Sequence, residues 1–197
     1  MPITQFSQLD LSKTYSYADY LTWQFDEFVE LIRGRVRRMS PAPRRQHQTV
    51  SFNLSAAIKQ FLRGKSCQGF AAPFDVRLTR STANGDASIE TVVQPDLCVI
   101  CDPQKLDDRG CLGAPDWVIE IVSPGNFARD TKEKYDLYEE AGVREYWLVL
   151  PGEKSVAVYV LEEGRYQPKG EYYTPGPIPV HTLPGVVLEW AEVFEGV

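Results

Sequence analysis

The chain has 197 residues, of which 43% are hydrophobic and 24% charged, and this composition is typical of a globular protein. The formal net charge of −6 argues against a protein that coats nucleic acid with its whole surface. No apolar run has the length of a membrane span, and the first residues lack a basic region followed by an apolar one. We therefore expect a cytoplasmic protein that does not enter a membrane, and, in the absence of repeats or linkers, a single domain over residues 1–197.

The N-terminal part of the chain predicts two helical regions separated by a strand. Residues 1–15 are polar and are expected to be irregular, whereas apolar residues from Ser16 to Ile32 recur at helical spacing, with Asp26 as the cap of a short second helix. A short strand is expected over 35–39, followed by a turn at 40–43. The apolar stripe formed by Val50, Leu54, Ala57, Ile58, Phe61 and Leu62 then predicts a helix over 45–63, which Gly64 ends.

The rest of the chain alternates strand and helix patterns, which predicts an α/β fold. Three strands are expected over 69–78, 92–101 and 116–123, separated by a loop over 79–90, with a turn at Asn84-Gly85, and by a polar loop over 102–115. A helix is expected over 130–141, followed by strands over 145–150 and 156–161 joined through Pro151-Gly152-Glu153. The tail from Tyr166 onward is rich in proline and glycine, which indicates edge strands and turns.

The four cysteines are Cys67, Cys98, Cys101 and Cys111. Cys98 and Cys101 form a CxxC motif, but Cys111 alone follows closely and no histidine lies near, so zinc would need a ligand from elsewhere. Cys98 also belongs to an apolar strand, where a thiol is a common filler. The pattern therefore favours buried structural cysteines over zinc or redox chemistry.

Two carboxylates interrupt apolar strands, Asp96 before Leu97, Val99 and Ile100, and Glu120 between Ile119 and Ile121. Burying a carboxylate is costly unless it is paired, hydrogen-bonded or bound to a cation. If the two strands are neighbours, the two side chains can bracket one divalent cation such as magnesium. The alternative is a pair of structural acids that are satisfied separately.

The helix over 130–141 offers a positively charged side chain for this site. Asp130, Lys134, Leu137, Tyr138 and Ala141 share one face, and charged side chains that we expect to be solvated occupy the other. An inward lysine needs an anion, which Asp96, Glu120 or a substrate phosphate would supply. The alternative is a lysine that extends its ammonium out along the helix.

Basic residues cluster before the first long helix. Six arginines fall within 13 residues: Arg33, Arg35, Arg37, Arg38, Arg44 and Arg45. Beside an acidic metal site such a segment can hold phosphates. It can equally be the solvated face of a hairpin.

Several separate strings of this chain resemble the Uma2 family, formerly DUF820. They are Glu30-Leu31-Ile32-Arg33-Gly34, Met39-Ser40-Pro41, His47-Gln48, Pro95-Asp96-Leu97, the segment 116–124, Arg129-Asp130, Lys134, Tyr138, and the segment 142–147. Their order and spacing match the family over roughly residues 20–190, so the resemblance covers nearly the whole chain.

The resemblance implies a restriction-endonuclease-like fold of the PD-(D/E)XK superfamily, a central mixed sheet flanked by helices, here with additional N-terminal and C-terminal strands. By position, Asp96 and Glu120 would be the ligands of Mg²⁺ (or Mn²⁺), and Glu30 the acid that this superfamily often contributes from an N-terminal helix. The usual lysine lies two residues after the Glu, where this chain has Val122, and Lys134 on the following helix would replace it. Gln94 and Ser123 flank the acids and would supply hydrogen bonds around them.

The function that this resemblance implies is a Mg²⁺-dependent endonuclease that hydrolyses phosphodiester bonds in DNA, acting as a homodimer. Asp96, Glu120, Lys134 and Glu30 would be its catalytic residues. The residues expected to contact nucleic acid are Arg33, Arg35, Arg37, Arg44, Arg45 and His47. The alternative is a catalytically silent module that binds DNA or a protein partner; Val122 and the acidic net charge favour it, whereas the retained acids and Lys134 disfavour it.

Overall fold

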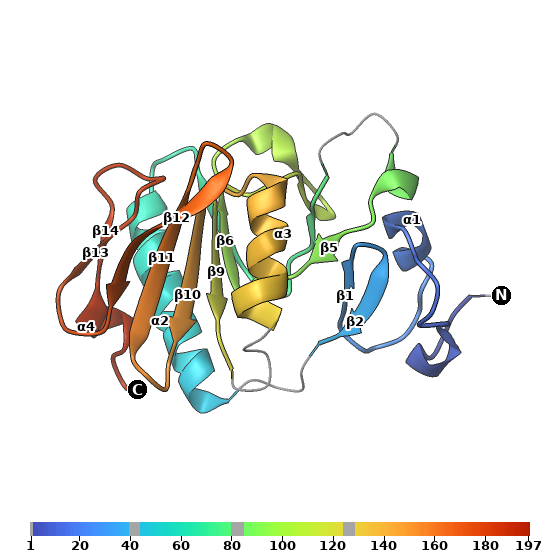
Figure 1. The fold of residues 1–197 in the computed structure, drawn as a ribbon, viewed down its shortest axis with the longest axis horizontal. Coiled ribbons are helices and arrows are strands. Elements are labelled where there is room, and N and C mark those ends of the chain that lie inside the picture. Colours follow the sequence, from blue (N-terminus) through green and yellow to red (C-terminus); the bar gives the residue numbers. More distant parts are fainter. Residues whose placement is uncertain (1, 40–43, 80–84, 124–128) are drawn as a thin grey trace.

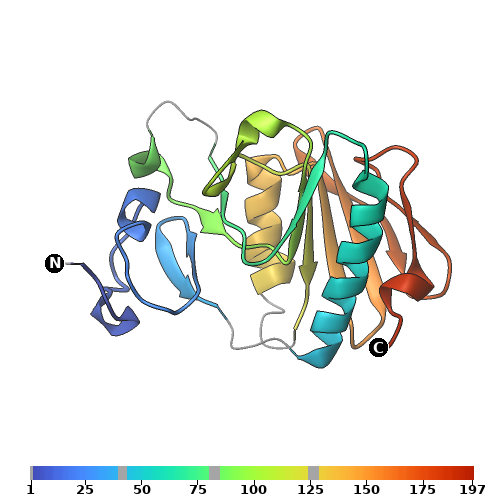
Figure 2. The same ribbon diagram turned by 180° about the vertical axis from the view of Figure 1, so that it is seen from behind.

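Figure 1 shows the computed structural model of the chain, which describes residues 2–39, 44–79, 85–123 and 129–197. In these ranges the strands form two six-stranded sheets and one two-stranded sheet. Helices lie on both faces of one of the large sheets, as Figures 1 and 2 show from opposite sides. The expected fold class, in which helices flank a central sheet, is confirmed, and its form is mixed α+β.

The central sheet has the strand order β12-β11-β10-β9-β6-β3. Its β9 and β10 are parallel and its other neighbours are antiparallel, so the sheet is mixed, as expected. Its strands are β3 (Gln68–Ala71), β6 (Leu97–Ile100), β9 (Trp117–Ile121), β10 (Glu145–Leu150), β11 (Ser155–Glu162) and β12 (Arg165–Tyr172).

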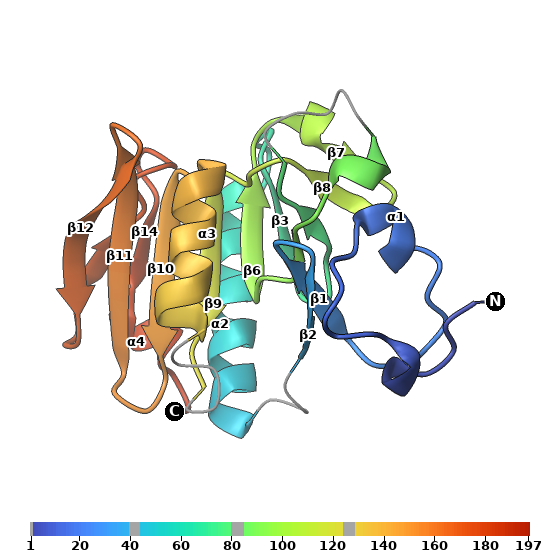
Figure 3. The same ribbon diagram turned by 45° about the vertical axis from the view of Figure 1, so that its right-hand side comes forward.

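The N-terminal sheet has the order β2-β1-β5-β4-β8-β7 and lies beside the central sheet (Figure 3). Its strands are β1 (Val29–Ile32), β2 (Arg35–Arg38), β4 (Val76–Arg77), β5 (Val92–Val93), β7 (Leu106–Asp107) and β8 (Gly110–Leu112). Near the C-terminus, β13 (Pro177–Pro179) and β14 (Val187–Glu189) pair with each other and precede the short helix α4 (Trp190–Val193). The short helices elsewhere are η1 (Phe6–Gln8), α1 (Tyr17–Tyr20), η2 (Asp86–Ser88) and η3 (Pro103–Lys105).

Two helices cover the two faces of the central sheet because each carries one apolar stripe. Helix α2 (Arg45–Leu62) buries Val50, Leu54, Ile58 and Leu62, which share a core with Leu97, Val99, Trp117 and Ile119. Helix α3 (Lys134–Ala141) follows the π-helical turn η4 (Arg129–Glu133) and buries Leu137 and Tyr138 against Cys98, Val118 and Val122. Successive side chains of β6 and β9 therefore point to α2 and α3 in turn, as the pleat requires.

The chain crosses from the N-terminal sheet to the central sheet at Pro95-Asp96. We expected one strand over 92–101, but β5 ends at Val93 and β6 begins at Leu97 in the other sheet. Proline has no N–H to continue a ladder, so the segment breaks there. The strand expected over 69–78 is divided in the same way, into β3 and β4, with Pro73 between them; the Ala72–Pro73 peptide bond is cis.

Two further expectations were wrong. Residues 16–32 form the single helical turn α1 and then the strand β1, because Val29 to Ile32 are all buried between neighbouring elements. Glu30 consequently lies on a strand and not on a helix. The polar segment 102–115 contains β7 and β8, which are too short to give a periodic signal.

The other elements agree with the sequence to within a few residues. The strand over 35–39 is β2, the helix over 45–63 is α2, and the strand over 116–123 is β9. The helix over 130–141 and the hairpin after it are η4–α3 and β10–β11, and strands β12 to β14 close the C-terminal part. The turns expected at 40–43 and at Asn84-Gly85 lie wholly or partly outside the described residues.

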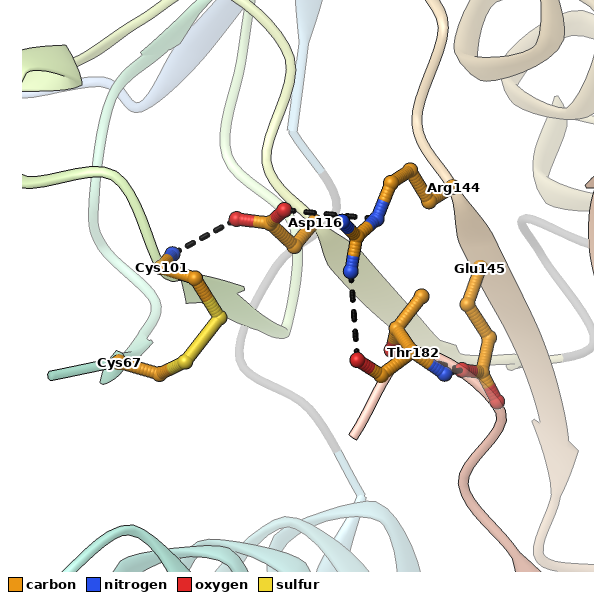
Figure 4. The surroundings of a disulfide bond; sticks show 6 residues. All are labelled: Cys67, Cys101, Asp116, Arg144, Glu145 and Thr182. Carbon is orange, nitrogen blue, oxygen red and sulfur yellow. Dashed lines mark hydrogen bonds and ion pairs between the residues drawn. A yellow bond between two sulfur atoms is a disulfide. The ribbon is translucent and has the colours of Figure 1, made fainter. Parts of the chain in front are cut away.

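A disulfide joins Cys67 to Cys101, which Figure 4 shows. The two residues flank the antiparallel pair β3–β6 at the end opposite Asp96, and Asp116 accepts a hydrogen bond from the Cys101 amide and pairs with Arg144. The two cysteines of the CxxC motif are therefore not bonded to each other. Cys98 and Cys111 are free thiols in the core, and burial raises the pKa of Cys111 to about 11.

Within the described ranges, none of the helices has both the length and the apolar character that crossing a membrane requires.

At Gly110, the backbone of β8 lies very close to the segment before β4. Its φ is +120°, and a Cβ built there would lie 2.1 Å from the Asp75 carbonyl oxygen, which also accepts a hydrogen bond from the Cys111 amide. We predict that Gly110→Ala lowers the free energy of unfolding by about 3 kcal/mol or more. Gly164, with φ of +78° and open space around a Cβ, is the matched control; Gly164→Ala should cost only about 1 kcal/mol. Urea unfolding measures both, and equal losses would contradict the close approach.

Candidate functional site

The centre of the candidate site is the ammonium of Lys134, which lies between two carboxylates. Its Nζ is 2.8 Å from Glu120 Oε1 and 2.9 Å from Glu30 Oε1. All three residues are almost wholly buried, with exposed fractions of 4% for Lys134, 3% for Glu120 and 0% for Glu30. The expectation that Lys134 points inward and finds an anion is therefore confirmed, and the alternative of an outward lysine is wrong.

Three elements bring these side chains together. Glu120 lies on β9 between Val118 and Val122, on the face that α3 covers. Lys134 is the first residue of α3 and shares the inward face with Leu137 and Tyr138. Glu30 comes from β1 of the N-terminal sheet, so the cluster connects the two sheets. The side chain of Asp130 lies outside the described residues.

Tyr138 completes the cluster, and sequence analysis did not place it in the site. Its hydroxyl donates a hydrogen bond of 2.7 Å to Glu120 Oε1. Burial and the neighbouring carboxylates of Glu120 and Glu30 raise the pKa of this hydroxyl well above its usual value, so it remains a donor at neutral pH. The signal was present in the sequence, because Tyr138 follows Lys134 by one helical turn.

Asp96 lies at the start of β6 and is more exposed than the cluster. Its Oδ2 accepts a hydrogen bond of 2.7 Å from the Ile121 amide on β9. Its Oδ1 lies 3.2 Å from Nε2 of His47, in the first turn of α2. Asp96 thus fixes the end of β9 next to Glu120 and contacts the helix on the opposite face of the sheet.

Asp96 and Glu120 belong to neighbouring parts of the central sheet. The β6–β9 ladder pairs Leu97 with Ile119, and Asp96 and Glu120 are the residues that adjoin this last pair. The sequence expectation that the two acids belong to neighbouring strands is confirmed.

The donor set suits a hard divalent cation whose protein ligands are few. Mg²⁺ is usually bound through one or two carboxylates and keeps several waters for substrate phosphates to replace. Asp96 and Glu120 offer two such carboxylates on adjacent strands. Among the described residues no group of three or more His, Cys, Asp or Glu side chains is arranged to hold a metal, so a complete protein cage for a metal is not formed there.

Val122, two residues after Glu120, is an apolar core residue and cannot supply a charge. It is buried and packs with Leu137, Tyr138 and Val118 in the core beneath α3. The ammonium that reaches Glu120 comes from Lys134, 14 residues along the chain.

Gln94 connects the cluster to a fourth acid. Its backbone amide donates to Glu30 Oε1 at 3.0 Å, and its side-chain Nε2 donates to Asp75 Oδ1 at 2.8 Å. Burial raises the pKa of the Asp75 carboxyl. Asp75 was missed, although it also lies between apolar residues, Phe74 and Val76, and so carries the same sequence signal as Asp96.

The arginines expected to contact nucleic acid have protein partners in most cases. Arg33 pairs with Glu140 at 2.7 Å and Arg37 with Glu133 at 3.3 Å, so the β1–β2 hairpin is tied to the helical segment that carries Lys134. Arg35 donates to backbone carbonyls of residues 11–13, among them that of Ser12, and Arg45 donates to the Gly196 carbonyl. Arg44, which is exposed, lines a cavity of about 160 Å³ together with His47 and Ser123.

Residues 17–191 match the model of the family Uma2, which is described as "Putative restriction endonuclease". An uncharacterised protein of Synechocystis sp. (strain ATCC 27184 / PCC 6803 / Kazusa), slr1290, is 26% identical over 149 residues, which cover 72% of this chain and 71% of that protein.

A solved structure has the same fold. The crystal structure of a "putative nuclease belonging to DUF820" from Anabaena variabilis superposes with a TM-score of 0.71. The superposition covers 91% of this chain and 97% of that one, at 19% sequence identity. Because the family match extends over most of the sequence and contains Glu30, Asp96, Glu120 and Lys134, the chain belongs to the Uma2 family.

Proposed function

We propose that this protein is a Mg²⁺-dependent endonuclease that hydrolyses phosphodiester bonds in DNA. The observation that carries the proposal is the contact of the Lys134 ammonium with Glu120 and Glu30 at 2.8 and 2.9 Å. It supplies, from α3, the positive charge that Val122 cannot supply. The family description and the fold of the DUF820 neighbour agree with a nuclease.

Asp96 and Glu120 would hold the cation. Bound between them, Mg²⁺ would lower the pKa of a coordinated water and neutralise charge on the phosphate; Mn²⁺ would serve in its place. The Ile121 amide holds Asp96 at the end of β9, and the Tyr138 hydroxyl holds Glu120, so both carboxylates have fixed positions. Lys134, which Glu30 also contacts, orients the second carboxylate.

Lys134 would stabilise the negative charge of the scissile phosphate. Its ammonium is shared by two carboxylates in a buried position, so its place is fixed before substrate binds. Asp96 and His47 are the more exposed members of the site, with side-chain exposed fractions of 22% and 14%. The substrate would therefore approach from the side of the sheet edge where Asp96 and the first turn of α2 meet.

A silent nuclease-fold module remains the second candidate. The observation that favours it is the burial of Lys134, because an ammonium that two carboxylates enclose can serve structure alone. The two candidates differ in one measurable property, namely the hydrolysis of DNA in the presence of a divalent cation.

The proposal includes two further elements. Two copies of the chain would act together, because two sites related by two-fold symmetry can cut both strands of a duplex. We also place the protein in the cytoplasm, where chromosomal and invading DNA are found. The Cys67–Cys101 disulfide argues against this location, because disulfides are uncommon in that compartment.

The nuclease proposal is tested with Asp96→Asn, which removes the charge but keeps an oxygen that can accept the Ile121 amide. Calorimetric titration of Mg²⁺ and Mn²⁺ should show binding to the wild type that weakens about tenfold or more in the variant, since carboxylate charge dominates binding of hard cations. Nicking of a supercoiled plasmid should fall by about 100-fold or more.

Asp108→Asn is the matched control, because Asp108 is exposed and its replacement changes the net charge by the same amount. It should leave both metal binding and nicking unchanged. Metal binding without nicking in the wild type would favour the silent module. Absence of binding at millimolar metal would show that Asp96 and Glu120 are structural acids.

The buried ion cluster is tested separately by Lys134→Met. This change removes the ammonium and leaves two buried carboxylates close together, so we predict a loss of about 3–5 kcal/mol in the free energy of unfolding. Lys132→Met, on the exposed side of the same helical segment, should cost less than about 0.5 kcal/mol.

A double variant identifies the cause of the loss in stability. Adding Glu30→Gln to Lys134→Met removes one of the two like charges, and it should recover part of the stability. Urea unfolding at neutral pH measures all four proteins. If Lys134→Met were as stable as Lys132→Met, the cluster described above would not exist in solution.

A further inference from the structure

A small cavity adjoins Asp96 on the side of α2. It has a volume of about 160 Å³ and lies between the first turn of α2, the end of β9 and the β10–β11 turn. Its lining residues are Arg44, Gln46, His47, Val122, Ser123 and the segment 150–153. We call it the α2–β10 pocket.

The pocket adjoins the proposed metal site through His47. His47 lines it, and its Nε2 lies 3.2 Å from Asp96 Oδ1. Val122 and Ser123, which directly follow β9, also line it, and Val122 is two residues beyond Glu120. The pocket thus lies next to the residues that would hold the cation. The elements that form it meet at the lower end of the central sheet in Figure 1.

The pocket has an apolar wall and no excess of positive charge. Val122, Leu150 and Pro151 form the wall, and the guanidinium of Arg44 is offset by the carboxylate of Glu153. Polar groups are confined to a few side chains, namely Arg44, Gln46, His47, Ser123 and Glu153. An apolar wall with a few convergent donors and acceptors is the environment of a flat ring that has polar edges.

The size of the pocket limits its occupant further. Pockets that enclose a complete drug-sized ligand have volumes of about 300–1,000 Å³. This pocket is smaller, so it can receive one ring system and leave the attached sugar and phosphate outside. The phosphate would then lie toward Asp96.

We propose that the α2–β10 pocket binds one nucleobase next to the phosphate that is cut. This inference rests on the proposed function. A base inside a regular duplex is stacked and cannot enter such a pocket, so the substrate must present an unpaired or extruded nucleotide. The pocket therefore assigns a substrate class, DNA with an unpaired nucleotide, in preference to an uninterrupted duplex.

Gly152 provides a direct way to fill the pocket. It lines the cavity, a Cβ built on it meets nothing within 4 Å, and its φ is not positive, so a larger side chain is compatible with the fold. Gly152→Leu is the blocking variant. Ala87→Leu, at an exposed residue of η2, is its control.

The experiment measures binding by fluorescence anisotropy in EDTA, where no cleavage occurs. The probes are three labelled oligonucleotide duplexes of one sequence: a full duplex, the duplex with one bulged nucleotide, and the same bulge without its base. Wild type and Ala87→Leu should bind the bulge with its base at least about fivefold more tightly than the abasic bulge. Gly152→Leu should bind both bulges equally and leave affinity for the full duplex within twofold.

A second pair of variants distinguishes a base contact from a backbone contact. Arg44→Ala should weaken binding of the base-containing bulge more than that of the abasic one, whereas Arg63→Ala, at the other end of α2, should affect both little. Equal losses on both probes would show that Arg44 contacts phosphates and would overturn the base pocket. So would equal binding of both bulges by the wild type, or an unchanged preference in Gly152→Leu.

The outcomes separate this inference from the nuclease itself. Base-dependent binding without plasmid nicking would support the pocket and overturn the enzyme. Nicking without base-dependent binding would do the reverse. Lack of binding to all three probes would overturn the pocket directly.

Discussion

The sharing of one buried ammonium by two carboxylates is the interaction on which the site depends. Lys134 comes from α3, Glu120 from the central sheet and Glu30 from the N-terminal sheet, so one side chain fixes three elements. An isolated charge in this position would be far too costly to bury, and removal of any member leaves the others uncompensated. The exposed pairs Arg33–Glu140 and Arg37–Glu133 connect the same hairpin to the same helical segment, but they are solvated and contribute little by comparison. The geometry near Glu120 therefore depends on the buried contact.

The crossing of the chain at Pro95 determines which residues gather around this contact. Gln94 is the last residue on the side of the N-terminal sheet, and its amide holds Glu30. Asp96 is the first on the side of the central sheet, and it accepts the amide of Ile121. Because proline cannot donate to a ladder, the strand is interrupted here, and the two neighbours of Pro95 are directed to different sheets. The short string Gln94-Pro95-Asp96 thus brings an acid of each sheet to one place.

Sequence reasoning located the site better than it located the elements. Asp96 and Glu120 were recognisable because each is an acid in an apolar strand, and Lys134 because helical spacing put it on the inward face. The same signal is present at Glu145, which begins the apolar run of β10, and at Asp75. Glu145 is as buried as Glu30, but all its partners are neutral donors: the Trp147 indole, the amides of His181 and Thr182, and the Thr182 hydroxyl.

The sequence could not show which segments pair with each other in the folded chain. Glu30 was expected on a helix because apolar spacing over 16–32 is helical, yet pairing with β2 and β5 made its segment a strand.

The contrast between Glu120 and Glu145 explains why one buried acid is suited to chemistry and the other to structure. Glu145 has four donors on its two oxygens and lies near the opposite end of the sheet, beside Asp116 and Arg144 (Figure 4), so its charge is dispersed over fixed dipoles. Glu120 receives an ammonium and a tyrosine hydroxyl on one oxygen, Oε1. It also adjoins the last pair of the β6–β9 ladder, as Asp96 does, and no second acid faces Glu145 across its ladders, where Trp117 and Val160 are its partners. Two like charges close together repel each other unless a cation compensates them. Lys134 contacts Glu120 and Glu30, and His47 contacts Asp96. The divalent cation proposed above would compensate Asp96 and Glu120 together.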